Sequence, residues 1–304
     1  MELVIRQIDT ALYPVLEQVI PEGASTLNAV DYTARRIVAN RKYLADVPAA
    51  KVKSSLILTL ADDNVGILSQ SAGKNIHELV SDLRKYGWDG FSTRYWMLAE
   101  LDPTVHYLSR ASFDSEVTPR SSHDDLFATI TANPGVSDRL WTAFNHIEAA
   151  TNLIDQHHIG FGFPIPGMMM KHYRAGPDPA WWAEVKNHYE QAAIELRLAL
   201  VNTDPGAKQL LFYYAKRGEY VIDYLNCVEA VRKSATAKKE GDLDAALENL
   251  DSAVEKLYDA IDSLSDVVRD ECDRGLIALL NTFAYRPLVD ERERVAREVA
   301  SSSR

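Results

Sequence analysis

The sequence has little cysteine, few basic residues relative to acidic ones and no long apolar run, and each shortage excludes a class of protein. Its two cysteines, Cys227 and Cys272, are too few for a disulfide framework and lack the spacing of a zinc site, so we expect two buried thiols. No stretch approaches the roughly 20 apolar residues of a membrane span. The N-terminus shows no basic region followed by an apolar stretch, so no signal peptide is visible. We therefore expect a soluble, cytoplasmic protein without a membrane partner.

The shortage of basic charge also excludes a typical nucleic-acid binder. Lys and Arg number 33 against 44 Asp and Glu, a formal net charge of -11. The acids are concentrated: residues 240–273 carry 12 of them against Lys256 and Arg269, which accounts for -10 of that charge. A solvated face of one helix explains such a run better than an acidic binding tail, although both fit the composition.

What the sequence does contain is enough apolar residue for a folded core. Its 304 residues are 46% hydrophobic, which rules out intrinsic disorder and suits one large domain or two ordinary ones. Residues 1–112 alternate between β-favouring runs and amphipathic helices, with strands expected at 25–30, 54–60 and 90–96 and helices at 12–20, 33–44 and 75–86. This order predicts a parallel sheet, because βα units connect parallel strands.

Polar and aromatic side chains follow all three predicted strands. The first strand ends on Asp31 and Tyr32, the second on Asp62, Asp63 and Asn64, and the third on Arg94, Tyr95 and Trp96. Ligands of parallel sheets bind beyond the carboxyl ends of the strands, where the βα loops gather. Carboxylates for proton transfer, rings for stacking on a pyranose and an arginine for an anionic group predict a sugar site.

Six of these residues also have a structural interpretation. Asp31 has the position of an N-cap for the helix that follows. Asp62, Asp63 and Asn64 fit a plain turn, and Tyr95 and Trp96 fit a core.

Residues 113–304 read as helices. Asp102-Pro103 and Thr118-Pro119 each place a capping residue before a proline, which predicts a helix start. Longer helices are expected from Ser137 to the His157-His158 pair, from Asp178-Pro179 to Val201, and after Pro205.

An apolar loop at residues 160–167 interrupts these helices, and we expect it to pack against another surface. The helical turn predicted after it would point His172 and Arg174 at a ligand, with plain packing as the alternative. Adjacent histidines on a helix do not face one ligand, so we expect no metal at His157-His158 and no cofactor.

The acidic segment also carries an apolar seam whose members are spaced alternately by four and three. They are Leu243, Leu247, Leu250, Val254, Leu257, Ile261, Leu264 and Val268. The spacing predicts a helix with one buried side. Because long helices flank it in sequence, packing within the chain explains the seam better than a coiled-coil dimer.

The three strand-end motifs resemble the last three strands of a (β/α)8 glycoside hydrolase. The motifs are Val30-Asp31-Tyr32-Thr33, Leu58-Thr59-Leu60-Ala61-Asp62-Asp63-Asn64 and Gly90-Phe91-Ser92-Thr93-Arg94-Tyr95-Trp96. A barrel followed by a helical domain is similar to α-glucuronidases and barrel hexosaminidases. The resemblance implies an α/β fold followed by a mainly α one: an incomplete barrel segment at 1–112 and a helical C-terminal domain at 113–304.

The same resemblance implies roles for the strand-end residues. Asp31, Asp62 and Asp63 would be base or substrate-binding carboxylates, and Arg94 and Trp96 would line the sugar subsite with Tyr32, Asn64 and Tyr95. These families place the general acid on an earlier strand, and a whole barrel needs about 250 residues. The chain is therefore expected to be the C-terminal part of a carbohydrate-active enzyme whose partner is a carbohydrate substrate, or a remnant of one that lacks chemistry of its own.

Two other functions remain open from the sequence. One is a helical interaction or assembly module without catalysis, forming a homo-oligomer through its helices. The other is a complete small-molecule enzyme of mixed α/β type, for which no full catalytic set is visible.

Overall fold

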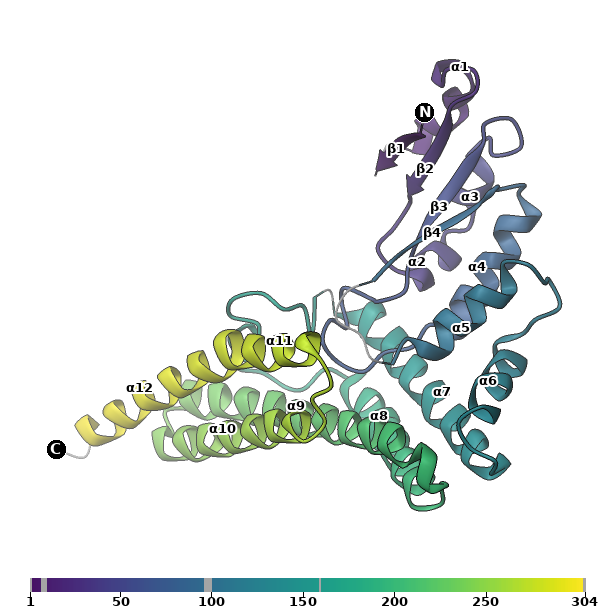
Figure 1. Cartoon of the computed structure of the whole chain (residues 1–304). Helices are drawn as coiled ribbons and strands as arrows, with labels where there is room; N and C mark the ends of the chain where they lie inside the picture. Colours follow the sequence, from purple (N-terminus) through teal and green to yellow (C-terminus); the bar gives the residue numbers. More distant parts are fainter. Residues whose placement is uncertain (1, 7–9, 96–99, 159, 303–304) are drawn as a thin grey trace. The chain divides into compact units, whose positions relative to one another are not determined.

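The computed structural model describes residues 2–6, 10–95, 100–158 and 160–302. They form a small parallel sheet with covering helices, followed by a larger set of helices (Figure 1). By contacts within the chain these are two compact units. The first, the α/β unit, holds Met1–Asp63 and Gln70–Ile130, and the second, the helical unit, holds Asn64–Ser69 and Thr131–Arg304. The first unit thus continues to Ile130, beyond the predicted range of 1–112, and six residues of its longest loop belong to the second.

The sheet has four parallel strands in chain order, not three. They are β1 (Glu2–Arg6), β2 (Ser25–Ala29), β3 (Ser54–Thr59) and β4 (Gly90–Arg94). The strand that sequence analysis missed, β1, pairs in parallel with β2, so that Val4 lies opposite Leu27. Its central residues Leu3, Val4 and Ile5 are apolar, but the run is short and flanked by charge.

Helices cover one face of this sheet. The helices of the α/β unit are α1 (Leu16–Val19), α2 (Ala34–Ala39), α3 (Lys42–Asp46), α4 (Gly73–Lys85), α5 (Asp102–Ala111) and α6 (Pro119–Ala128), with a 3-10 turn, η1 (Thr10–Val15). Leu56 and Leu58 of β3 are fully buried in one core with Ile37 of α2 and Leu79 of α4. Ile57, between them in sequence, faces the other way and is only half-buried.

The helix starts predicted in this unit differ in their outcome. Thr118 caps α6 through a reciprocal pair of bonds with Ser121, as its position before Pro119 predicts. Asp102 is already the first residue of α5, and the cap position belongs to Leu101. The single helix expected at 33–44 is two short helices, α2 and α3, separated by Asn40 and Arg41.

The helical unit is built around one long helix. Its helices are α7 (Pro134–His157), α8 (Trp182–Val201), α9 (Lys208–Glu240), α10 (Leu243–Ser265), α11 (Glu271–Leu280) and α12 (Arg286–Ser302), with 3-10 turns η2 (Met170–His172) and η3 (Pro205–Ala207) and a π-helical turn η4 (Asn281–Tyr285). Helix α9 packs against both α8 and α10, and α7 packs against α8. Gly241, with φ of 88°, ends α9 in the left-handed conformation and allows α10 to fold back along it.

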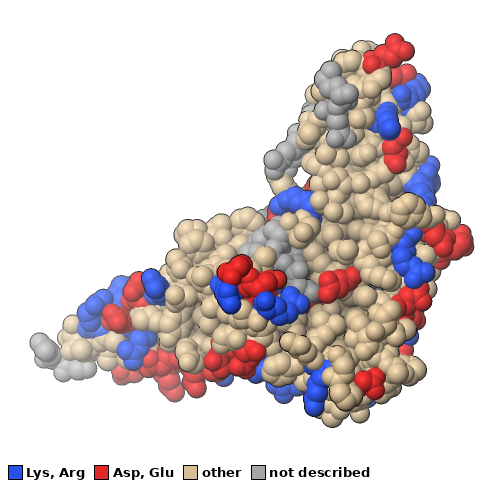
Figure 2. Space-filling view, in the orientation of Figure 1, with Lys and Arg blue, Asp and Glu red and all other residues tan. Residues whose placement is uncertain are grey.

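Helix α10 carries the predicted seam, but its most buried stripe is shifted. Alanines alternate with leucines along it, in the order Ala246, Leu250, Ala253, Leu257, Ala260 and Leu264. The remaining seam members of α10 are half-buried. Small alanines let α9 approach closely, so the seam packs within the chain, while acidic side chains line the outer edge of α10 (Figure 2).

The two cysteines have different environments. Cys227 of α9 is buried, as expected, whereas Cys272 in the first turn of α11 is exposed. None of the helices in the described part of the chain combines the length and apolar character that a membrane span requires.

The loop 64–69 contacts the apolar loop 160–167 inside the helical unit. The backbone of Ile67 donates to the carbonyl of Gly162 at 3.2 Å, and Gly162 donates to the carbonyl of Asn64 at 3.0 Å. A Cβ on Gly66 would lie 2.0 Å from the Gly162 oxygen, and Gly66 also has φ of 68°. Only glycine fits so close a backbone approach, and the expected packing of loop 160–167 is confirmed.

Candidate functional site at the strand ends

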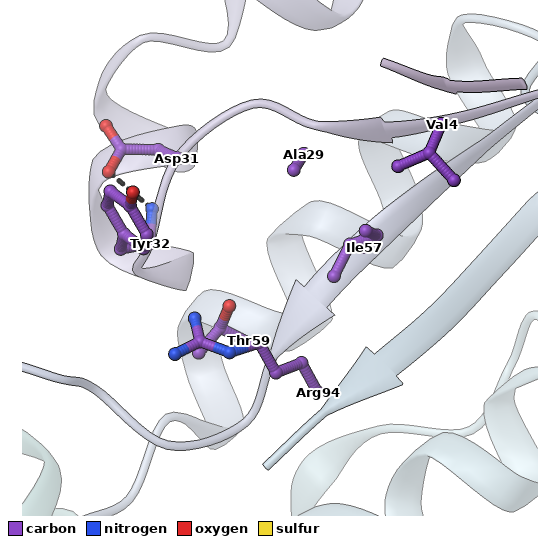
Figure 3. A pocket seen from close by; sticks show the side chains of 7 residues that line it. All are labelled: Val4, Ala29, Asp31, Tyr32, Ile57, Thr59 and Arg94. Carbon is purple, nitrogen blue, oxygen red and sulfur yellow. Dashed lines mark hydrogen bonds between the residues drawn. The ribbon is translucent and has the colours of Figure 1, made fainter. Parts of the chain in front are cut away.

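A pocket of about 210 Å³ lies in the α/β unit on the sheet face that helices leave open. Its lining, called the strand-end pocket below, is Val4, Ala29, Asp31, Tyr32, Ile57, Thr59 and Arg94 (Figure 3). Three of these seven residues, Asp31, Tyr32 and Arg94, were predicted as site residues. Its apolar side chains lie along the strands, and its polar groups lie where the strands end.

The parallel strands bring these residues together. Ala29 and Thr59 are the last residues of β2 and β3, and Arg94 is the last residue of β4. Thr59 lies opposite Arg94 in the register of β3 with β4. Asp31 and Tyr32 follow β2 directly, so groups from all three strands meet at the carboxyl edge of the sheet.

The carboxylate of Asp31 does not cap the following helix. Thr33 is the N-cap of α2, and its hydroxyl accepts from the backbone nitrogen of Arg36 at 3.2 Å. Asp31 instead accepts from the backbone nitrogen of Tyr32 at 2.6 Å. The capping interpretation of Asp31 is therefore wrong, and the structure places its carboxyl group in the pocket lining.

Arg94 links the pocket to Asp63. Its Nη2 lies 2.8 Å and 3.0 Å from the two carboxylate oxygens of Asp63, and its guanidinium carbon lies 5.9 Å from the centre of the Tyr32 ring. The Arg94 side chain is 41% exposed and that of Asp63 is 16% exposed. The ion pair is thus in contact with solvent. Asp63 holds the Arg94 guanidinium in place, and the two opposite charges cancel.

Other predicted residues of this edge lie outside the pocket lining. Asp62 is buried at 8% exposure, and its backbone nitrogen donates to the side chain of Gln70. Tyr95 follows β4 and is 66% exposed, so it is not part of a core. Trp96 lies outside the described residues.

Asn64, His172 and Arg174 belong to the helical unit instead. The Asn64 amide donates to buried Asp155 at 2.6 Å and accepts from the backbone of Gly160 at 2.9 Å, which fastens loop 64–69. His172 is buried, and its Nε2 donates to the carbonyl of Phe161 at 3.3 Å. Burial, with Lys171 and His158 nearby, lowers the pKa of His172 well below its ordinary value. Arg174 donates to Nε2 of His158 at 3.1 Å.

Sequence reasoning missed four lining residues: Val4, Ala29, Ile57 and Thr59. Recognising Leu3-Val4-Ile5 as a strand would have placed Val4 next to the pocket. Ala29, Ile57 and Thr59 lie on strands that were predicted. Side chains alternate between the two faces of a strand, so Ile57 and Thr59 could have been assigned to one face of the sheet.

The strand-end pocket can hold a ligand that is apolar on one side and polar on the other. Tyr32 offers a ring, Thr59 a hydroxyl group, Asp31 an acceptor and Arg94 donors. In the part of the chain that the structure describes, no group of three or more His, Cys, Asp or Glu residues is placed to hold a metal ion.

Comparison with known proteins gives a likeness of fold. No family model and no curated protein matches this sequence. A solved GH138 enzyme that targets the pectin rhamnogalacturonan II matches with a TM-score of 0.53 and 12% identity, over 88% of this chain and 39% of that enzyme. The present chain thus spans about two fifths of that enzyme's length, and the likeness is one of fold alone.

Proposed function

We propose that this chain is the C-terminal part of a carbohydrate-active enzyme, a glycoside hydrolase, and that it contributes the strand-end pocket to the sugar-binding cleft. The observation that carries the proposal is the meeting of Asp31, Tyr32 and the Arg94–Asp63 pair at one edge of a parallel sheet. Carboxylates, a ring and a guanidinium are the groups that position a sugar and move its protons.

The sheet itself supports a barrel segment. Its strands follow one another in chain order, and helices cover only one face. This is the arrangement of consecutive βα units in a (β/α)8 barrel, in which the opposite face lines the interior. Val4 on that face is 65% exposed in this chain, and further βα units would cover it.

Within this function, Asp31 is the proposed general base or sugar-binding carboxylate. Arg94 would bind an anionic or hydroxyl group of the sugar, with Asp63 holding its guanidinium, and Tyr32 would stack on the ring. Asp62, Tyr95 and Trp96 remain proposed neighbours of the sugar. The general acid would come from an earlier strand.

Carbohydrate binding by the chain tests the proposal. Calorimetric titration with D-glucuronate and with rhamnogalacturonan II, the polymer targeted by the matching enzyme, should show binding. Asp31→Asn and Arg94→Gln should each weaken it by about tenfold or more, since each removes a charged hydrogen-bonding group. The matched control is Glu22→Gln, an exposed carboxylate of the same unit outside the pocket lining.

Two results would contradict the proposal. One is a wild-type chain that binds neither carbohydrate. The other is binding that Asp31→Asn and Arg94→Gln leave unchanged while both variants keep the wild-type circular dichroism spectrum.

A further inference from the structure

A second group of polar side chains lies in the helical unit, between the end of α7 and the start of α8. It comprises His157, His158, Lys171, Arg174 and Trp181 and is called the basic cluster below. All five residues belong to the helical unit, so the cluster stands on observations separate from those of the strand-end pocket.

Among the residues that the structure describes, no carboxylate forms an ion pair with Lys171 or Arg174 of the basic cluster. The sequence from 156 to 177 contains neither Asp nor Glu. The next acidic residue in sequence, Asp178, forms an ion pair with Arg232 instead, with 2.8 Å between its Oδ1 and Nε of Arg232. Among the described residues, neither Lys171 nor Arg174 has a carboxylate oxygen within ion-pair distance: Lys171 donates to the carbonyl of Gly160 and Arg174 to His158.

The other half-buried lysines of this unit differ from Lys171. Lys186, Lys216 and Lys238 each lie 2.8 Å from a carboxylate oxygen, of Glu229, Asp266 and Glu298 respectively, and Lys256 lies 3.0 Å from a carboxylate oxygen of Asp259. A partly buried charge costs free energy unless it is paired. Burial, with Arg174 nearby, lowers the pKa of Lys171 to about 8, which is the expected consequence of a missing counter-ion.

His158, which contacts Arg174, is held in one tautomer. Arginine only donates, so Nε2 of His158 must accept from Arg174, and the ring proton sits on Nδ1. Arg174 is exposed, so its remaining N–H groups can reach a ligand.

An aromatic surface adjoins the cations. The rings of His157 and Trp181 are stacked, with centres 5.8 Å apart and planes 9° from parallel. Trp181 also packs edge-on near His158, with ring centres 6.3 Å apart. A flat, half-exposed indole next to His158, which in turn contacts Arg174, suits a compact ligand with an anionic group and a carbon frame.

We propose that the basic cluster binds a small ligand bearing an oxyanion, the carboxylate of an acidic sugar or a phosphate group, with the anion between Lys171 and Arg174 and the rest of the ligand against Trp181. The bound anion is the counter-ion that the protein does not supply. This site is additional to the strand-end pocket and does not depend on the function proposed for it.

Titration of the chain with three probes tests the site. Sodium phosphate, D-glucuronate and D-glucose are added at low ionic strength and pH 7, with binding followed by calorimetry and tryptophan fluorescence. Phosphate or glucuronate should bind, and glucose, which lacks the charge, should not. Binding of glucuronate alone identifies an acidic sugar as the ligand, and binding of phosphate alone identifies a phosphate compound.

Variants tie the binding to the cluster. Lys171→Gln and Arg174→Gln should each lower the affinity for the bound anion by about tenfold. Lys239→Gln, which removes an exposed lysine at the end of α9, should leave it unchanged.

The proposal is overturned if the wild-type chain binds neither anion, or if Arg174→Gln binds as tightly as the wild type. Arg174 is exposed, so its replacement tests the site even where replacement of the half-buried Lys171 disturbs folding.

Discussion

The helical unit encloses its central helix on several sides, whereas the α/β unit covers only one face of its sheet. Tyr213, Tyr214 and Ala215 of α9 are consecutive and all buried, which a helix with a single buried stripe does not allow. On β3, by contrast, buried Leu56 and Leu58 alternate with half-buried Ile57. The difference teaches that the helical unit surrounds its central helix with its own residues, while the sheet of the α/β unit has helices on one face and the strand-end pocket on the other.

The close backbone contact between loops 64–69 and 160–167 gives the largest expected effect. Gly162→Ala places a Cβ 2.1 Å from the carbonyl oxygen of Val65, and the backbone on both sides must move. We expect a loss of about 3 to 5 kcal/mol in the free energy of unfolding, measured by chemical denaturation.

Gly275→Ala is the control for this variant. Gly275 lies within α11 with nothing near its Cβ position, so alanine should stabilise the chain by about 0.5 to 1 kcal/mol. Equal stability of Gly162→Ala and wild type would show that the loop contact is not fixed.

Neighbouring residues of β3 test the contrast between the two sheet faces. Leu58→Ala should cost about 2 to 5 kcal/mol, because Leu58 is fully buried under the helices. Ile57→Ala, on the open face, should cost about 1 kcal/mol. The comparison is made by urea denaturation, and similar losses for both would mean that the open face is covered in solution.

The smallest expected effect is a pH dependence of the protein's stability, caused by a pair of histidines between α7 and α8. Nδ1 of His146 lies 3.0 Å from Nδ1 of His188, and burial together with His188 lowers the pKa of His146 below its ordinary value of 6.5. The unfolded chain then binds the proton more readily than the folded chain. The folded state is therefore most stable above pH 6.5, and the free energy of unfolding declines as the pH falls below that value. Melting temperatures from pH 8 to 5 should fall less in His146→Gln and in His188→Gln than in wild type; parallel curves would refute the assignment.

Local patterns in the sequence predicted most helices and three of the four strands. Apolar spacing located α7 and α10, the threonine before Pro119 located the start of α6, and Asp178-Pro179 indicated α8, which begins at Trp182, because these signals act within one or two turns. Which face of α10 is most buried could not be predicted from its sequence. The alanines at 246, 253 and 260 are buried because α9 packs against them.

The candidate site was predictable only in part, for a similar reason. Asp31, Tyr32 and Arg94 meet because parallel strands end at one edge, which is a rule of topology. Asn64 follows the same strand as Asp63, yet it belongs to the other unit, because Gly66 and Gly162 bring loop 64–69 against loop 160–167. Contacts between segments about 100 residues apart leave no local signal beyond the glycines themselves.

Loop 64–69 also bears on how the chain is synthesised and folds. The carbonyl of Ile67 accepts from Arg217 and from Tyr220, at 3.4 Å in each case, across 150 and 153 residues of sequence. At ribosomal rates those partners emerge roughly 8 to 30 seconds after the loop. Val65, Ile67 and Leu68 are buried in the folded protein, so the packing of this loop in the helical core is completed only after α9 has been synthesised.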